Sequence, residues 1–522
     1  MIKKIKYKFL LLVVVLTTGI SSSCNKYLDT KPQDGLVQQD YWKTKEQLSA
    51  AVAGCYVSLI VPTTTKTIPL ARYLFSWGEL RADMVQSTND PAASGLSTSG
   101  LSTLQRDELD MMHDDLVSTN SLTNWEAVYR TINYCNNIIK YGPGVINNDN
   151  TLTQSALNAA LAEARTLRGL MYFYLLRTFG EVPLKLDPTV TDTDIKAIAK
   201  SSQQDVYNQI ISDLQFGVQN AVPSYGNIPD DKGRITKYTA ATILADAYLW
   251  GEDYQNCINA CDIVIQSNMY QLLPTGTQPG DFLNNVYANG NSVEGIFEFQ
   301  YNLQALNPFY DMFQNTGHDF MAADWIVAGN LYGIDVNDAT DKDVRGAGTA
   351  YLESNGAIWK YTSNKTTTTS YTHWFVYRYS DVLLMKAEAL AWVHPGDAGN
   401  GTLATNLVHQ VRTARHALPI VNSVSIADPD PTSALAVSTY VFNERAREFP
   451  FEGKRWYDIL RNAKRNNYAN ENILLDIVAS SALPAKQQTV INKFRDHRSH
   501  YLPIFATELQ TNNLLVQNSF YQ

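Results

Sequence analysis

The sequence predicts a mainly α-helical protein built from paired helices, with one long irregular insert that carries a few short strands. Three observations support this prediction. Apolar residues recur with helical spacing over several long segments. Strand-like runs are few and short, and they fall at residues 296–301 and 375–377. Between about residues 268 and 374, scattered aromatic residues, glycines and asparagines replace any regular period.

The chain opens with the features of an export signal. A basic start is followed by the apolar run 9–16 and by the small residues 21–23, which end at Cys24. The apolar run is far shorter than the ~18 residues that a membrane-spanning helix needs. Small residues running into a cysteine resemble a bacterial lipoprotein signal, which implies removal of residues 1–23 and attachment of lipid to Cys24. The alternative is a plain signal peptide in which Cys24 is incidental.

Composition limits the partners of the exported protein. The chain has 42 Lys and Arg against 51 Asp and Glu, and loss of the four signal lysines changes the formal net charge from −9 to −13. So acidic a chain does not suggest nucleic acid as a partner. Its 30 Tyr, 18 Phe and 9 Trp provide material for a large core and amphipathic rings suited to flat polar ligands.

Three segments show the strongest helical pattern, at residues 124–139, 161–179 and 379–392. The second is expected to end at Gly180, because glycine stops helices and Pro183 follows shortly. A single helical hairpin cannot bury its apolar face alone. Hairpins over 124–179 and 379–415 are therefore expected to stack into a helical scaffold.

Residues 244–258 resemble one tetratricopeptide unit, in which two helices form a hairpin. The sequence LADAYLWGEDYQNCI places its turn at Asp253 and Tyr254. The unit needs a small residue at Cys257, where the two helices touch, so we expect this cysteine to be buried. The same structural role is expected for Cys55, Cys135 and Cys261, because no C-x-x-C pair and no zinc spacing occurs.

Residues 444–461 carry acids and arginines three and four positions apart, on two expected helices interrupted at Pro450 and Gly453. This spacing predicts ion pairs along the helix faces. A catalytic interpretation would make Glu448 and Glu452 the carboxylate pair that glycoside hydrolysis requires. However, an arginine lies within one turn of each acid and lowers its pKa, whereas a general acid needs a raised pKa. We therefore expect both glutamates to be structural.

Six ordered motifs resemble those of SusD/RagB-type outer-membrane nutrient-binding lipoproteins, a family similar to starch-binding proteins. In chain order they are CNKYLDTKPQD, NWEAVYRTINYCNNII, AEARTLRGLMYFYLLRTFGEVPL, YRYSDVLLMKAEAL, NERAREFPFEGKRWYDILR and LPIFATELQTNNLLVQNSFY. The motifs span almost the whole chain. The resemblance implies one SusD-like domain over residues 24–522, with a helical scaffold at about 40–267 and 375–465 and a ligand-binding insert at about 268–374.

The resemblance also implies a function. Proteins of this family capture glycans, or in some members peptides, at the cell surface and deliver them to a SusC-like TonB-dependent transporter. It implies an outer-membrane position anchored through acylated Cys24, with no enzymatic activity and no cofactor. A secreted glycoside hydrolase is the alternative from another class. No metal is expected, because the acidic run 335–341 lacks the glycine and terminal glutamate of a calcium loop.

The ligand-binding residues are expected in two regions that vary within the family. One surrounds the Glu-Leu-x-x-Asp element at 79–83, and the other is the insert. Sugars stack their C–H faces on rigid, exposed aromatic rings and bond their hydroxyls to polar side chains. For any one ring the alternative is a place in the core, since large aromatic residues usually bury most of their area. The candidates are Trp77, Arg81, Asp83, Tyr310, Phe320 and Trp325.

Overall fold

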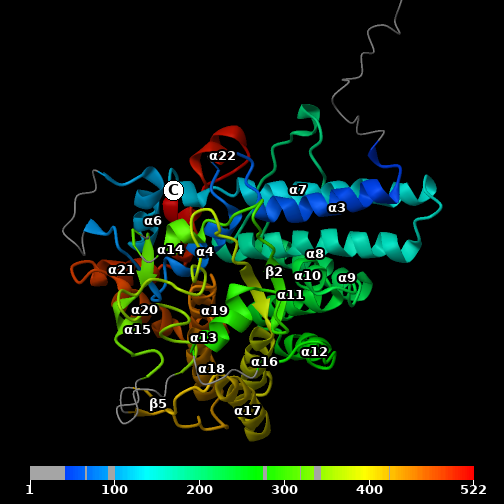
Figure 1. Cartoon of the computed structure of the whole chain (residues 1–522). Coiled ribbons are helices and arrows are strands. Elements are labelled where there is room, and N and C mark those ends of the chain that lie inside the picture. The colour runs from blue at the N-terminus through cyan, green and yellow to red at the C-terminus, as the bar shows by residue number, and fades with distance from the viewer. Residues whose placement is uncertain are drawn as a thin grey trace, which may run out of the picture.

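The computed structural model describes residues 41–64, 67–91, 100–273, 279–314, 316–317, 319–333, 343–421 and 424–522. Most of the regular structure in these residues is helical, with three two-stranded sheets beside it (Figure 1). The predicted fold class is confirmed. The export signal and Cys24 lie outside the described residues.

The scaffold is a succession of helices in which each packs against the next (Figure 1). In order, these helices are α3 (Lys45–Ile60), α7 (Glu126–Tyr141), α8 (Gln154–Phe179), α9 (Gln203–Asn220), α11 (Lys237–Trp250), α12 (Tyr254–Ile265), α16 (Tyr379–Val393) and α17 (Ala398–Ala414). Helix α18 (Ala434–Glu448) then packs against both α16 and α17. The stacking predicted from the two hairpins at 124–179 and 379–415 is therefore present, and one continuous apolar core runs through the stack.

Helix α8 shows how sequence and packing together set an element. The Thr153 side chain accepts a hydrogen bond from the Ala156 backbone at its start, and Gly180, with φ of 75°, ends it. Every residue from Thr166 to Phe179 is buried, because α7, α9 and α11 all lie against this helix. The predicted end is confirmed, whereas the helix begins seven residues before the expected start.

The tetratricopeptide-like hairpin lies where the sequence places it, in α11 and α12, with Asp253 as the N-cap of α12. Cys257 is fully buried, and its Sγ lies 3.9 Å from the carbonyl oxygen of Met385 in α16. A larger side chain at this position would separate the hairpin from α16. Cys55, Cys135, Cys257 and Cys261 are all free and buried, which confirms the structural interpretation.

A second group of helices joins the start of the chain to its end. Its members are α4 (Leu70–Glu79), α6 (Thr103–Met112), α19 (Arg455–Tyr468), α20 (Glu471–Ser481), α21 (Gln487–Phe494) and α22 (Ala506–Thr511). All ten residues of α4 are buried, and α4 packs against α19. Short connecting helices are η2 (Ser121–Thr123), η3 (Gly142–Asn147), η4 (Asp192–Asp194), α10 (Ile228–Gly233), η6 (His497–His500) and η7 (Ser519–Tyr521).

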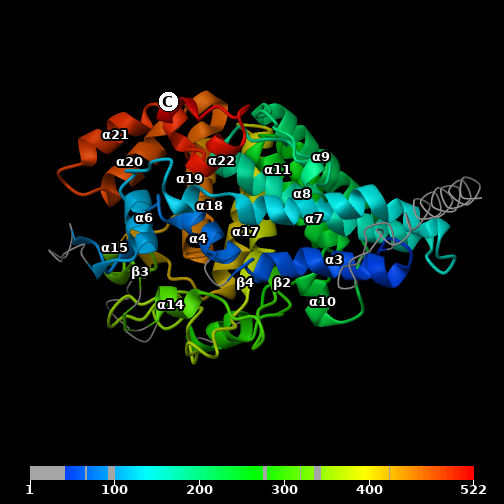
Figure 2. The same ribbon diagram turned by 90° about the horizontal axis from the view of Figure 1, so that it is seen from above.

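The insert between α12 and α16 contains α13 (Pro279–Phe282), η5 (Leu283–Ala288), β2 (Gly295–Phe299), α14 (Phe309–Phe313), β3 (Phe320–Ala322), α15 (Asp324–Val327) and β4 (Trp374–Arg378). Strands β2 and β4 pair antiparallel, which confirms the two predicted strand segments. Strand β3 pairs with β1 (Val85–Ser87), and a short hairpin joins β5 (Ile420–Val421) to β6 (Val424–Ser425). The insert is thus tied to an earlier part of the chain by the pairing of β3 with β1, and its last strand, β4, leads directly into α16. Figure 2 shows α14 of the insert along the edge of the molecule opposite α21.

Candidate functional site

Two of the predicted ligand-binding residues lie together where the insert meets the scaffold. The indole Nε1 of Trp325 donates a hydrogen bond of 2.6 Å to the backbone carbonyl of Asp83. The Asp83 carboxylate accepts bonds of 2.8 and 2.9 Å from Nε and Nη2 of Arg455, at the start of α19. This bidentate pair fixes the backbone at Asp83. The position of Trp325 is therefore set by residues from three distant parts of the chain.

Polar side chains from β1 and from the start of α15 lie beside this pair. The Gln86 side-chain amide donates to Asp324 at 2.8 Å and accepts from the Asp324 backbone at 3.2 Å. Gln86 and Asp324 are exposed or partly exposed, and Trp325 is half-buried. We call Asp83, Gln86, Asp324 and Trp325 the sheet-edge surface. Tyr310 is also partly exposed, on α14, which packs against β3.

The other three predicted site residues are buried, which corrects their expected place at the surface. Trp77 is 2% exposed and donates to the Leu122 carbonyl at 2.7 Å, because all of α4 lies in the core. Phe320 is 1% exposed, since its strand faces the core. The Arg81 guanidinium is bonded to Asp114 and to the backbone carbonyls of Ser499 and His500. These side chains are too buried to form a ligand-binding surface. Trp325, Asp83 and Tyr310 are the predicted site residues that remain partly exposed.

Glu448 and Glu452 lie in a buried ion network. Glu448 contacts Arg378, Arg415 and Arg345 at 2.8, 2.9 and 3.2 Å. Burial alone would raise the pKa of Glu448, but attraction from the three guanidinium groups outweighs burial and holds this pKa well below its usual range. In the same way Arg378 and Lys360 lower the pKa of Glu452 to about 2. A general acid needs the opposite shift, so this carboxylate pair has the character of a structural network.

The predicted ladder of ion pairs along single helices is mostly wrong. Among the described residues, only Glu444–Arg447 and Asp458–Arg461 pair within a helix in this segment. The principal partners come from elsewhere in the chain, because the two helices bury these acids against the insert and α17. These long-range partners are Arg345, Lys360, Arg378, Glu388, Arg412 and Arg415.

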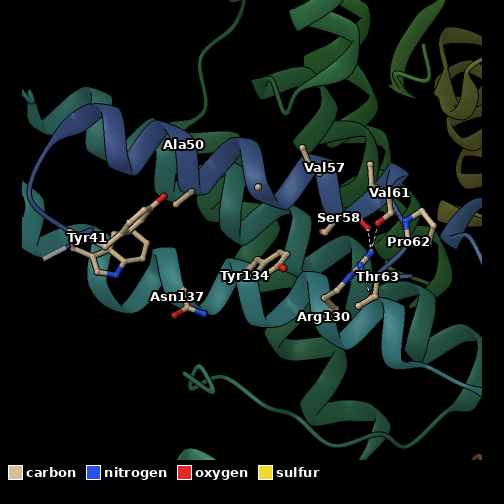
Figure 3. Close-up of a pocket in the computed structure, with 13 residues that line it drawn as sticks. Tyr41, Ala50, Val57, Ser58, Val61, Pro62, Thr63, Arg130, Tyr134 and Asn137 are labelled. Atoms are coloured by element: carbon tan, nitrogen blue, oxygen red, sulfur yellow. Dashed lines mark hydrogen bonds between the residues drawn. The ribbon is translucent and has the colours of Figure 1, made fainter. Parts of the chain in front are cut away.

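A groove that sequence reasoning missed lies on the scaffold between α3 and α7 (Figure 3). Its cavity volume is about 580 Å³, and its walls include Trp42, Ala50, Gly54, Arg130 and Tyr134. One signal could have revealed it. The sequence places small or apolar residues at positions 50, 54, 57 and 61, which is one face of a helix, and no helix or strand within the described ranges covers that face.

Comparisons with known proteins agree with this architecture. A model described as the SusD family matches residues 275–521, and a second, described as starch-binding associating with outer membrane, matches residues 65–249. SusD-like protein P2 of Formosa agariphila is 26% identical over 98% of this chain and 99% of its own length. The chain belongs to the SusD/RagB family.

Solved structures of SusD proteins share the fold. A SusD superfamily protein from Bacteroides vulgatus is 20% identical, with a TM-score of 0.69 over 92% of this chain and all of the other. A structure described as a laminarin-binding SusD-like protein is 18% identical, with a TM-score of 0.66 over 91% of this chain and 99% of the other. At such identities these two likenesses establish the fold and not the ligand.

Family membership establishes the broad class of activity. SusD proteins are glycan-binding proteins associated with the outer membrane, and they bind without catalysis. In the part of the chain that the structure describes, no group of three or more His, Cys, Asp or Glu could hold a metal, and the acidic run 335–341 lies outside that part. No helix in the described ranges combines the length and apolar character needed to cross a bilayer.

Proposed function

We propose that this SusD-family protein captures an oligosaccharide at the cell surface and delivers it to a SusC-like TonB-dependent transporter. The ligand would lie on the sheet-edge surface. One observation carries this proposal: Trp325 is half-buried, yet its orientation is fixed by the bond to the Asp83 carbonyl. Co-purification of a large β-barrel transporter with the tagged protein checks the partner.

The chemistry of the sheet-edge surface suits a sugar. A ring that is already ordered loses little conformational entropy when a ligand stacks on it. The amide of Gln86 and the carboxylate of Asp324 can both exchange their mutual hydrogen bond for bonds to sugar hydroxyls. Asp83 has a different role from the one expected, because Arg455 already occupies its carboxylate. We assign Asp83 to positioning Trp325.

Replacement Trp325→Ala is expected to weaken oligosaccharide binding by about 2 kcal/mol, roughly thirtyfold in Kd, because a stacked aromatic residue is typically a binding hot spot. Isothermal titration calorimetry against plant, host and microbial glycans, with a peptide pool as the alternative ligand, gives the measurement. The matched control is Trp392→Ala, which removes another half-buried tryptophan from α16 and should leave affinity unchanged. Equal affinities for Trp325→Ala and wild type would place the site elsewhere, and binding of peptides alone would favour the peptide-binding alternative.

The anchor is proposed to be lipid on Cys24, which lies outside the described residues. Several acyl chains at ~0.8 kcal/mol per buried CH₂ hold a protein firmly at a membrane surface. Cys24→Ala should therefore give a folded protein that no longer sediments with outer membranes. Fractionation after a high-salt wash measures this, with Cys55→Ala as the control. A Cys24→Ala protein that stays in the membrane pellet would exclude lipid at this residue as the anchor.

A further inference from the structure

The groove between α3 and α7 has the dimensions of a ligand site. Its volume of about 580 Å³ falls in the range of roughly 300–1,000 Å³ that is usual for small-molecule pockets. Its wall on α3 runs from Ala50 to Val61, which at ~1.5 Å per residue is a length of about 16 Å. That length suits a short linear ligand lying between the two helices, as Figure 3 shows.

Small residues leave space along the α3 side of the groove. Ala50, Ala51 and Gly54 form the α3 wall, and a Cβ atom added at Gly54 would have no heavy atom within 4 Å. The space beside this glycine is therefore unfilled by other described residues. On the same side, Val57 and Val61 are 50% and 41% exposed. These two valines add apolar surface to the α3 side of the groove.

Aromatic rings and hydrogen-bonding groups supply the chemistry of the groove. Tyr134, on α7, lies at the middle of the groove and is 44% exposed. Tyr41 and Trp42 close one end of the groove, and the centroids of their rings are 5.2 Å apart. Figure 3 shows Tyr134 between this aromatic end and Arg130. Asn137 adds a side-chain amide to the wall, and its Nδ2 donates to the Asn133 carbonyl at 2.8 Å, so the amide oxygen is the group it offers to a sugar hydroxyl. Exposed rings beside amides and hydroxyls are the combination that binds the alternating apolar and polar faces of a sugar.

Arg130 is held rigidly at the other end. Its Nη1 donates to the Thr63 hydroxyl at 2.6 Å, and its Nη2 donates to the carbonyls of Ser58 and Val61 at 2.8 and 2.7 Å. These bonds satisfy carbonyl groups at the C-terminus of α3. Within the described residues, no hydrogen bond uses the second hydrogen on Nη1, so a donor of fixed position remains for a ligand oxygen.

The size of the groove decides between a sugar and a protein as its occupant. Stable protein interfaces use about 20–30 residues on each side. The groove is lined by 13 residues, several of them polar, and this is too small a surface to hold a protein alone. The same surface is sufficient for a few sugar units. Because Arg130 is the only charged residue among the described lining residues and its charge faces α3 carbonyls, a neutral ligand fits better than an acidic one.

We propose that the α3–α7 groove is a second carbohydrate-binding site, in which a neutral oligosaccharide stacks on Tyr134 and bonds to Arg130 and Asn137. This inference rests on the proposed function, because it assigns the same ligand class to a separate place on the scaffold. It predicts that the chain binds two short oligosaccharides independently. One lies at the sheet-edge surface and the other in the groove.

The test disables the groove and the sheet-edge surface separately in the purified full chain, the groove by the variants below and the sheet-edge surface by Trp325→Ala. Gly54→Leu directs a side chain into the groove from a position where an added Cβ meets no heavy atom within 4 Å, and Tyr134→Ala removes the ring on which the sugar stacks. The matched control is Gly144→Leu, since Gly144 also has no heavy atom near an added Cβ and does not line the groove. The probes are maltohexaose, laminarihexaose and xylohexaose, titrated by calorimetry to determine affinity and stoichiometry.

For the probe that wild type binds, we expect two sites per chain. Gly54→Leu and Tyr134→Ala should each weaken the groove site roughly tenfold or more and leave the other site intact, whereas Tyr134→Phe and Gly144→Leu keep both. Trp325→Ala should show the reverse pattern. One site that responds to Trp325→Ala and not to Gly54→Leu would overturn the groove and leave the proposed function standing. Binding of none of the probes would count against both the groove site and the proposed function. If Gly54→Leu no longer co-purifies with the transporter but binds sugar as wild type does, the groove is a protein-docking surface instead.

Discussion

Glu448→Gln is expected to lower the free energy of unfolding by about 3–5 kcal/mol, a large fraction of the roughly 5–15 kcal/mol that stabilises a typical protein. Glu448 is fully buried, and it accepts hydrogen bonds from the side chains of Arg345, Arg378 and Arg415. An amide has one acceptor atom in place of two and turns its NH₂ group toward these donors. Removal of the negative charge also leaves three buried guanidinium groups with too little compensation.

Urea unfolding followed by tryptophan fluorescence measures this loss. The matched control is Asp115→Asn, which neutralises an acid whose pair with Lys486 is about half exposed on both sides. Because exposed ion pairs contribute about 0–1 kcal/mol, this control should unfold close to wild type. A Glu448→Gln protein as stable as Asp115→Asn would mean that the arginines reach other acceptors when Glu448 is neutral.

The ion network also shows that ion pairs between residues distant in the sequence could not be predicted from the sequence. Spacing within 444–461 correctly predicted two helices and the interruption between them, because helical periods and helix-breaking residues are local signals. It found the within-helix pairs of Glu444 and Asp458 and missed the long-range partners of these acids. Arg345 lies 99 positions before Glu444, and Arg378 lies 70 positions before Glu448, so no local pattern connects them. Only the folded packing of insert, α16 and α18 brings these groups together.

The candidate site was likewise predicted only in part from the sequence. The sequence singled out Trp325 and Asp83 as separate candidates, and the structure joins them by a hydrogen bond. Composition could not tell which rings of the two regions are buried, since Trp77 and Trp325 are equally apolar. Whether each ring faces the core depends on the packing of α4 and on the pairing of β1 with β3. The α3–α7 groove was missed for a related reason, because an exposed apolar helix face has the same pattern as a buried one.

Gly78→Ala is expected to cost more than about 4 kcal/mol, which places it among the exceptional single substitutions. Gly78 lies on α4 directly against the turn between α18 and α19. A Cβ atom at position 78 would overlap the carbonyl oxygen of Gly453 and lie 2.7 Å from its Cα. Both are backbone atoms, so no side-chain rotation can make room. The helix and the turn would have to separate.

That separation is opposed by other contacts of the same turn. The Gly453 backbone N–H donates a 2.8 Å hydrogen bond to the Glu79 carboxyl group, whose pKa burial raises to about 8. Gly453 itself has φ of 69°, a left-handed conformation that favours glycine. Moving the turn would break this bond and disturb Trp374, which lies against Gly453. We therefore expect Gly78→Ala to accumulate as misfolded protein or to unfold at much lower urea concentration.

The control for this prediction is the same substitution at an open position. Gly54→Ala adds a Cβ to the surface of α3, where nothing lies within 4 Å, and should leave stability unchanged or raise it by up to about 1 kcal/mol, because alanine favours helix over glycine. Soluble yield and urea midpoints of the two variants are compared in one experiment. If Gly78→Ala unfolds at the wild-type midpoint, α4 does not approach the turn at Gly453 as closely as the structure shows. If instead Gly78→Ala fails and Gly54→Ala does not, the close contact between α4 and this turn is needed for a stable fold.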